Sequence, residues 1–400
     1  MANNLSASFP EIWAKEQQEV FYKQNVAMAV SDVSFKSTMS RGDVLNRPYR
    51  STITAQAYTR GTAITIDDLT DTQEAMSINA EYATGFYVDN FDQIQSNYDV
   101  AANYGRDAGV VLSNKVDAYV FGDYASAAST VDDGDIGGTS GNAIALTTSN
   151  VLAVVSASKK KLQKLNIPMD KLFGLISPEF EEILIQYGAG RDTQMGDAAN
   201  KNGFLFHFYG FDLYRSNQLS GSAVLAMATD VTADDTIVIE GVTLTAKASP
   251  AAAGEFDVTG TADGTRAVIA SLINNPGTTN ATQIALSAAN QRIFESISAT
   301  NDDTANTLTV VAKGVGVLNV SETLTDVTDT WTATSQAQHN LFGRKGAFTL
   351  VVQSEPSVKV RPVQDKLGKN LLNGVLFGHK VYVDGGKQLV DVQIKSSTFS

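Results

Sequence analysis

The stretch from residue 92 to residue 121, DQIQSNYDVAANYGRDAGVVLSNKVDAYVF, constrains the fold more than any other part of the chain. Its apolar and small residues recur in steps of four and three from Ile94 to Tyr119, which predicts one continuous helical stripe and not a strand. Such a helix is roughly 45 Å long at about 1.5 Å per residue, longer than one small core requires. Gly105 and Gly109 each cost about 1 kcal/mol relative to alanine in a helix, so they predict a closely packed neighbour. We therefore expect a long scaffold helix.

Composition places the chain among folded proteins without disulfide bonds. Its 400 residues are 43% hydrophobic, which is enough to bury a large core and suggests two or three domains. The absence of cysteine excludes thiolate nucleophiles and cysteine metal sites, and it fits synthesis in a reducing cytoplasm. Neither a signal peptide nor an apolar run of about 18 residues is found, so no membrane span is expected. The net charge of −13 argues against a surface that coats nucleic acid.

Acidic residues are concentrated in one segment. Residues 226–338 hold 13 Asp and Glu against 4 Lys and Arg, a net charge of −9, which leaves −4 for the rest of the chain. Short Thr- and Val-rich runs with one or two helical stretches predict a small β-rich module there. Strand-like sequences resume beyond it, so we expect the segment to interrupt a larger body that carries a sheet.

Two predicted strands near the N-terminus are joined by a long polar connection. Residues 51–58 and 74–89 are rich in Thr, Ile, Tyr and Val, which favours strands. A connection of this length is more often functional or mobile than a simple turn. Its acidic residues Asp67, Asp68 and Asp71 are typical of a solvated tip, and a cation site is the alternative.

Capping and turn residues predict several further elements. An amphipathic helix is expected over residues 9–29, followed by an extended arm. Ser149 is predicted to cap a helix that ends before Pro168. Ser177 is expected to cap a helix directly after a buried strand, and two strands are expected to meet at a turn around Gly210.

Catalytic signatures are missing from the sequence. It has no phosphate-binding loop, no dinucleotide fingerprint, no zinc-protease motif and no serine-hydrolase elbow. His207, His339 and His379 are far apart, and structural histidines are the ordinary interpretation, with a general base as the alternative. Arg344 and Lys345 lie between two glycines, which suits a hinge loop or a phosphate cradle. We therefore predict no catalytic, cofactor or metal site.

Taken together, the ordered pieces resemble the major capsid proteins of tailed bacteriophages, whose shared architecture is named after phage Hong Kong 97. The most specific pieces are VDNFDQIQSNYD with NKVDAYVF, and NIPMDKLFGLISPEF, within a resemblance that covers roughly residues 8–225 and 340–395. The resemblance implies an α+β, Hong Kong 97-like capsid fold with an inserted domain. Its parts would be an N-terminal arm over 1–48, an extended E-loop over 49–80, a peripheral domain over 81–148 with the spine helix 92–121, an axial domain over 149–225, an inserted β-rich surface domain over 226–338, and closing strands over 339–400.

This resemblance implies a structural protein and not an enzyme. Subunits would assemble as hexamers and pentamers into an icosahedral shell that encloses double-stranded DNA without binding it specifically. Portal and scaffolding proteins would be partners, a decoration protein is a candidate partner of the inserted domain, and no membrane is involved. The location would be the virion, with assembly in the host bacterial cytoplasm. An encapsulin-type bacterial compartment shell is the first alternative, and a β-rich surface adhesin or carbohydrate-binding protein is the second.

Charged residues of the connection are the candidates for contacts between subunits. The resemblance places the acidic loop 61–75 over an adjacent subunit, so Asp67, Asp68 and Asp71 would contact basic residues there. The candidate basic residues are Arg41, Arg47 and Lys159–Lys161.

Overall fold

The computed structural model describes residues 25–37, 42–50, 55–64, 66, 68, 71–95, 100–189, 207–332, 334–354, 359–363 and 366–395. These residues divide into two compact units, which we describe separately. Unit 1 contains the described residues of 31–112 and 348–382, and unit 2 contains those of 25–30, 113–347 and 383–400. Helices and strands are both abundant in the chain, which confirms the predicted α+β class.

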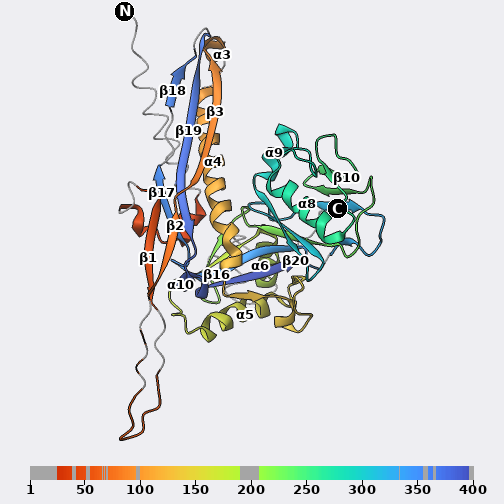
Figure 1. Cartoon of the computed structure of the whole chain (residues 1–400). Coiled ribbons are helices and arrows are strands. Elements are labelled where there is room, and N and C mark those ends of the chain that lie inside the picture. The colour runs from red at the N-terminus through yellow and green to blue at the C-terminus, as the bar shows by residue number, and fades with distance from the viewer. Residues whose placement is uncertain are drawn as a thin grey trace, which may run out of the picture. The chain divides into compact units, whose positions relative to one another are not determined.

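Unit 1 is built on the long strand β19 (Gly368–Lys380), as Figure 1 shows. One side of β19 pairs antiparallel with β3 (Ala80–Asp89), and the other side pairs with β17 (Thr349–Ser354) and β18 (Lys359–Pro362). A separate two-stranded sheet joins β1 (Val44–Arg50) and β2 (Asp71–Ser77), with Val44 opposite Ser77 and Arg50 opposite Asp71. The long connection predicted from the sequence therefore joins the end of β1 to the start of β2.

The strands of this hairpin differ from those predicted. The strand expected over 51–58 is wrong for its described part, because residues 55–58 pair with no strand. The partner of β2 is instead β1, which the sequence had assigned to the N-terminal arm, and the strand expected over 74–89 is divided between β2 and β3. Pro48 lies within β1, where it is tolerated because β1 has one strand partner among the described residues.

The predicted helix over 92–121 is described as two helices. These are α3 (Asn90–Gln95) and α4 (Val100–Phe121), and residues 96–99 lie outside the described residues. The 22 residues of α4 confirm the long helix, and its buried stripe includes Leu112 and Val116. Ile94 is 79% exposed, so the apolar stripe does not extend into α3 as a buried face.

Unit 2 contains a ten-stranded sheet, to which residues 226–338 contribute strands beside those of the rest of the unit. We call residues 226–338 the inserted segment, after the prediction from the sequence. The order is β12-β13-β8-β16-β5-β7-β6, with β20 pairing β16 and β4, and with β15 pairing β8. The junction is the antiparallel pair β8–β16, in which Ser222 lies opposite Ala337. The bounds are β4 (Ser129–Val131), β5 (Leu172–Ile176), β6 (His207–Phe208), β7 (Phe211–Arg215), β8 (Gly221–Ala226), β12 (Ile297–Asp302), β13 (Thr307–Ala312), β15 (Thr330–Trp331), β16 (Ala337–Arg344) and β20 (Leu389–Lys395).

Local signals predicted several elements of unit 2 correctly. The Phe180 N–H donates to Ser177 Oγ at 3.2 Å, which confirms that cap, and β6 and β7 form the hairpin expected at Gly210. The helix predicted after Ser149 is preceded by Asn150, whose side chain does not cap it. The predicted helix 9–29 falls mostly outside the described residues.

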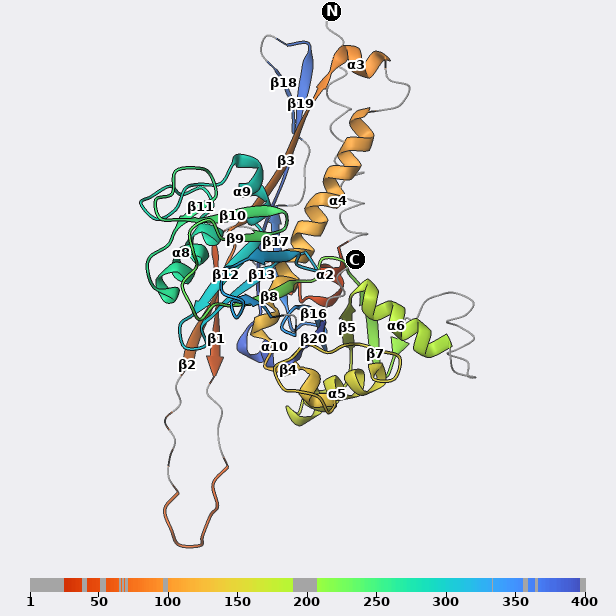
Figure 2. The same ribbon diagram turned by 90° about the vertical axis from the view of Figure 1, so that its right-hand side faces the viewer.

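The helices of unit 2, besides the end of α4, are α2 (Val26–Val30), α5 (Val151–Lys164), α6 (Pro178–Ala189), α8 (Ala262–Asn274), α9 (Ala288–Phe294) and α10 (Val383–Lys387), several of which are labelled in Figure 2.

The inserted segment has a hydrophobic core of its own. A second sheet runs in the order β11-β10-β9-β14, with bounds Glu255–Asp257, Val242–Lys247, Thr236–Ile239 and Val320–Thr323. One buried cluster extends along the chain from Ala223 to Leu318, and a second cluster fills the space between α5, α6 and the body strands. The segment therefore belongs to unit 2 through the shared sheet while it packs around a distinct core that begins in β8.

Polar side chains of α8 hold this core to the sheet. Arg266 is fully buried; its Nε donates to Asn301 Oδ1 at 2.9 Å, and its other nitrogens donate to the Met227 carbonyl and the Asp263 carboxylate. At the edge of β12, the Asn274 side-chain amide takes the place of a neighbouring strand. Its Nδ2 donates to the Ala299 carbonyl at 2.8 Å, and its Oδ1 accepts from the Ala299 N–H at 2.9 Å. These bonds satisfy groups that burial would otherwise leave unpaired.

Candidate interaction surfaces

The connection between β1 and β2 carries exposed apolar side chains. Tyr58, Ile64 and Ile66 are 63%, 61% and 89% exposed, and both Figure 1 and Figure 2 show this part of the chain projecting from the hairpin. Burying one such side chain contributes about 1.5–3 kcal/mol. Single exposed apolar residues are ordinary on proteins, whereas several on one projecting segment mark a contact site. We call Tyr58, Ile64 and Ile66 the apolar strip.

Two of the acidic residues predicted to make contacts are described, one on the connection that carries the apolar strip and one at its end. Asp68 is exposed on the connection, and Asp71 begins β2 opposite Arg50. Asp67 and Arg41 lie outside the described residues. Asp68 therefore lies on the same connection as the exposed apolar side chains. Those apolar side chains were not among the contact residues predicted from the sequence.

The predicted basic partners have contacts within their own units. The Arg47 guanidinium lies 4.9 Å from the centre of the Tyr382 ring, in unit 1. In unit 2, the ammonium groups of Lys159 and Lys161 donate hydrogen bonds to backbone carbonyls, while Lys160 is exposed. A contact of these residues with another subunit stays a prediction.

A second group of exposed apolar side chains lies at the α3 end of unit 1. Phe91, Ile94 and Leu367 are 59%, 79% and 63% exposed. The Asn90 N–H donates to the Leu367 carbonyl at 3.0 Å, which holds the start of α3 beside the β18–β19 turn. Unit 1 therefore presents apolar surface at two separate parts of its sequence.

A buried serine–histidine–aspartate chain crosses three strands of unit 2. His339 Nδ1 is 2.9 Å from Asp391 Oδ2, and His339 Nε2 is 3.0 Å from Ser222 Oγ. The Tyr124 ring stacks on the imidazole with its centroid 3.5 Å away, and burial together with the Asp391 charge raises the pKa of Tyr124. Nothing near His339 in the sequence indicates these partners, because they lie far away in the chain and are brought together only by the pairing of β8, β16 and β20.

This chain of hydrogen bonds lacks the surroundings of a serine nucleophile. Hydrolases stabilise the oxyanion with backbone N–H groups that are free to donate to it. Ser222 lies in the middle of the sheet, opposite Val311 on one side and Ala337 on the other, so its backbone belongs to the strand ladders. Tyr124 covers one face of the imidazole. We therefore interpret the arrangement as a structural link between three strands.

We expect Ser222 to resist a fluorophosphonate probe, because it has no preformed oxyanion site. Peptide mass spectrometry of the labelled full-length protein would measure the modification.

In parallel, His339→Ala is expected to destabilise unit 2 by about 3 kcal/mol, since it leaves the Asp391 carboxylate buried without its partner. Labelling of Ser222 that His339→Ala abolishes would contradict the structural interpretation.

The cationic pair between Gly343 and Gly346 is engaged with neighbouring side chains. Arg344 donates to both carboxylate oxygens of Asp170, at 3.1 and 3.0 Å, and this hydrogen bonding lowers the pKa of Asp170. Lys345 Nζ donates to Tyr214 Oη at 2.6 Å. These contacts favour the loop interpretation over a phosphate cradle.

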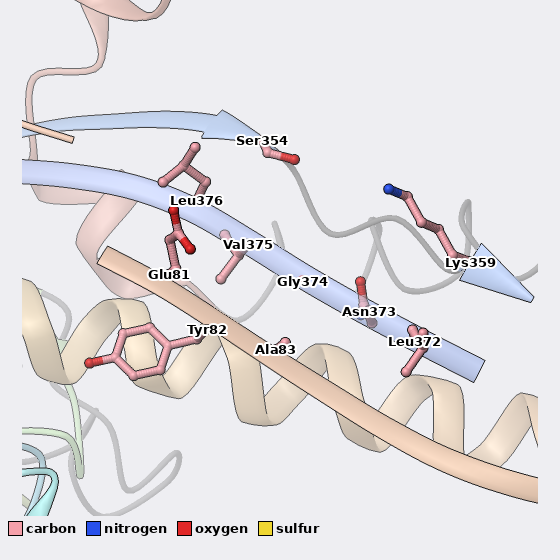
Figure 3. Close-up of a pocket in the computed structure, with 10 residues that line it drawn as sticks. All are labelled: Glu81, Tyr82, Ala83, Ser354, Lys359, Leu372, Asn373, Gly374, Val375 and Leu376. Atoms are coloured by element: carbon pink, nitrogen blue, oxygen red, sulfur yellow. The ribbon is translucent and has the colours of Figure 1, made fainter. Parts of the chain in front are cut away.

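A groove of about 550 Å³ lies on the unit 1 sheet where β17 ends and β18 begins (Figure 3). Its lining combines charged side chains with apolar ones. The residues are Glu81, Tyr82, Ala83, Ser354, Lys359, Leu372, Asn373, Gly374, Val375 and Leu376. The segment 355–358, which joins two of these residues, lies outside the described residues, so we assign no ligand to the groove.

No group of three or more His, Asp or Glu side chains in the described part of the chain is placed to hold a metal ion. No helix there has both the length and the apolar character needed to cross a membrane.

Comparison with models of known protein families and with curated protein sequences found no match. Solved structures do match. One from Mycobacterium phage Che8 has 14% identity and a TM-score of 0.53, over 92% of this chain and 90% of that chain. The capsid structure of the cyanophage P-SCSP1u has 14% identity and a TM-score of 0.49, over 90% and 85%. A virus-like particle from Pyrococcus furiosus has 8% identity and a TM-score of 0.43, over 96% and 99%.

The match to the Che8 structure extends over nearly the whole of both chains, so it shows a shared fold. A fold shared with a phage structure agrees with the phage capsid fold that the sequence resemblance implied.

Proposed function

We propose that this chain is the major capsid protein of a tailed bacteriophage, a structural protein that assembles into the icosahedral head shell around double-stranded DNA. The observation that carries the proposal is the shared fold with the Che8 structure over 92% of this chain. The exposed apolar strip supports it, because a chain that functions alone gains nothing from several apolar side chains on a projecting segment.

Assembly follows from repeated contacts between identical subunits. Closed symmetry lets one weak contact recur many times, and interwoven segments enlarge the area buried between neighbours. In this proposal the apolar strip packs on an adjacent subunit, and the acidic residues beside it orient the contact. Subunits form hexamers and pentamers, with portal and scaffolding proteins as partners and a decoration protein on the acidic inserted segment.

The overall charge fits a container better than a DNA-binding surface. A net charge of −13 repels phosphate, so the enclosed DNA is held by confinement and not by specific contacts. The chain then acts in the virion after assembly in the host cytoplasm. An encapsulin-type compartment would share the fold but would enclose protein cargo, so nuclease-protected DNA in the particle distinguishes the two.

Sedimentation of the purified full-length chain, expressed with and without a candidate scaffolding protein, tests the proposal. Closed shells sediment as megadalton particles, far above the 42.6 kDa of a single chain. A uniform monomer or dimer under every condition would contradict it.

The acidic contact has its own test. We expect the double substitution Asp67→Lys and Asp68→Lys to weaken shell assembly, because it places like charges against the proposed basic partners. Screening over about 10 Å at 0.1 M salt means that the defect should shrink as salt is raised. Assembly yield against salt concentration measures this, and unchanged assembly at low salt would remove the acidic contact.

A further inference from the structure

A buried carboxylate holds the first described helix of the chain. Asp117 lies on α4, and its two carboxylate oxygens accept hydrogen bonds from the Val26 N–H at 3.1 Å and the Ala27 N–H at 2.9 Å. These N–H groups belong to the first turn of α2, where they have no partner within the helix. Asn25 completes the end, since its Oδ1 accepts from the Met28 N–H at 2.8 Å. The start of α2 is therefore capped by its own neighbour and by a residue 91 positions away.

The carboxylate is enclosed when α2 is in place. Asp117 is 2% exposed, and Ala27 and Val30 pack from α2 with no exposed surface. Burial raises the pKa of Asp117 to about 7, against the opposing effect of the two N–H donors. The sequence of α2, VAMAV, brings no charged group to the site. Neither do the positions one turn away on α4, which are Ser113, Asn114, Val120 and Phe121.

We propose that Asp117 is a proton-dependent clamp, which holds the start of α2 against α4 within unit 2. The clamp closes more tightly as the pH falls. This inference does not rest on the proposed function, because it concerns a contact within one chain.

The sign follows from where the proton binds. With α2 released, Asp117 is in water and its carboxyl returns to its ordinary pKa near 3.8. The docked state therefore binds a proton more tightly than the released state does, so docking strengthens as the pH falls from about 7 toward 3.8. Each pH unit within that window corresponds to about a tenfold change in the docking equilibrium. Above the window the ionised, buried carboxylate bears its full desolvation cost, and docking is at its weakest.

Hydrogen exchange of the unassembled full-length chain measures this equilibrium directly. The Val26 and Ala27 amides exchange only when the clamp opens, so the opening constant is their exchange rate divided by the intrinsic rate at each pH. We expect that constant to be about tenfold smaller at pH 6 than at pH 8. Equal opening constants at the two pH values would overturn the proposal without any variant.

Asp117→Asn identifies the group responsible. The amide keeps one acceptor oxygen but cannot ionise, so we expect no change in the opening constant between pH 6 and pH 8. Asp107→Asn, an exposed position on the same helix, is the matched control and should keep the tenfold difference. A pH difference that survives in Asp117→Asn would show that another group is responsible and would overturn the assignment.

Discussion

Replacing Ile64 and Ile66 by serine is expected to prevent shell assembly while leaving the folded subunit intact. Both side chains are more than half exposed in the single chain, so their loss removes little stabilisation of the fold. If each is buried against a neighbour, the double variant loses about 3–6 kcal/mol per contact, which reduces the association constant more than a hundredfold. Sedimentation should therefore show folded subunits and no megadalton particles.

The matched control is Val327→Ser. Val327 is 90% exposed, as Ile66 is 89% exposed, but it belongs to unit 2, whereas the apolar strip belongs to unit 1. We expect this variant to assemble normally. Normal assembly of the Ile64→Ser, Ile66→Ser variant would show that the apolar strip does not form a subunit contact.

Replacing Arg266 by methionine is expected to destabilise the inserted segment by about 1–3 kcal/mol. Methionine fills much of the volume but donates no hydrogen bond, so the buried Met227 carbonyl and the half-buried Asn301 Oδ1 lose the donor that Arg266 supplies. Asp263 is 58% exposed and stays solvated, so the loss comes from the buried groups more than from that carboxylate.

Urea denaturation followed by Trp331 fluorescence measures this loss. Trp331 packs against the core of the inserted segment, and Trp13→Phe removes the second tryptophan of the chain. Arg292→Met, at an exposed position on α9, should change stability by less than about 0.5 kcal/mol. Equal unfolding midpoints for the two variants would mean that the buried arginine contributes no net stability.

Elements with strong local signals were predictable from the sequence. The stripe that ends at Tyr119 gave α4, and Ser177 followed by Pro178 gave the start of α6. In these places a cap or a period of 3.6 residues acts within a few positions, so no distant contact is needed.

Elements that depend on distant partners were not predictable in this way. In β1, the half-buried positions Leu45, Arg47 and Tyr49 alternate with exposed ones, but an arginine and Pro48 conceal the strand pattern. Its partner β2 follows only after the long connection. The predicted buried stripe began at Ile94, which has the helical spacing but is exposed in the structure. Spacing along the sequence does not show whether another part of the chain covers a residue.

On the connection between β1 and β2, the sequence indicated acidic residues as contact candidates but did not indicate the exposed isoleucines. Asp68 was identified because acidic residues cluster along the connection. Ile64 and Ile66 lie on either side of Thr65 in an otherwise mostly polar connection, and two isoleucines at this spacing in a solvated loop were the available signal. The burial of Asp117 had no local signal at all, because α2 reaches it from 90 residues away.

Electron cryomicroscopy of the particle formed by the full-length chain tests the central claim most directly. We predict a closed icosahedral shell in which the connection between β1 and β2 lies on a neighbouring subunit, with Ile64 and Ile66 buried in the contact. An open assembly without icosahedral symmetry, or a shell in which these two side chains remain in solvent, would contradict it.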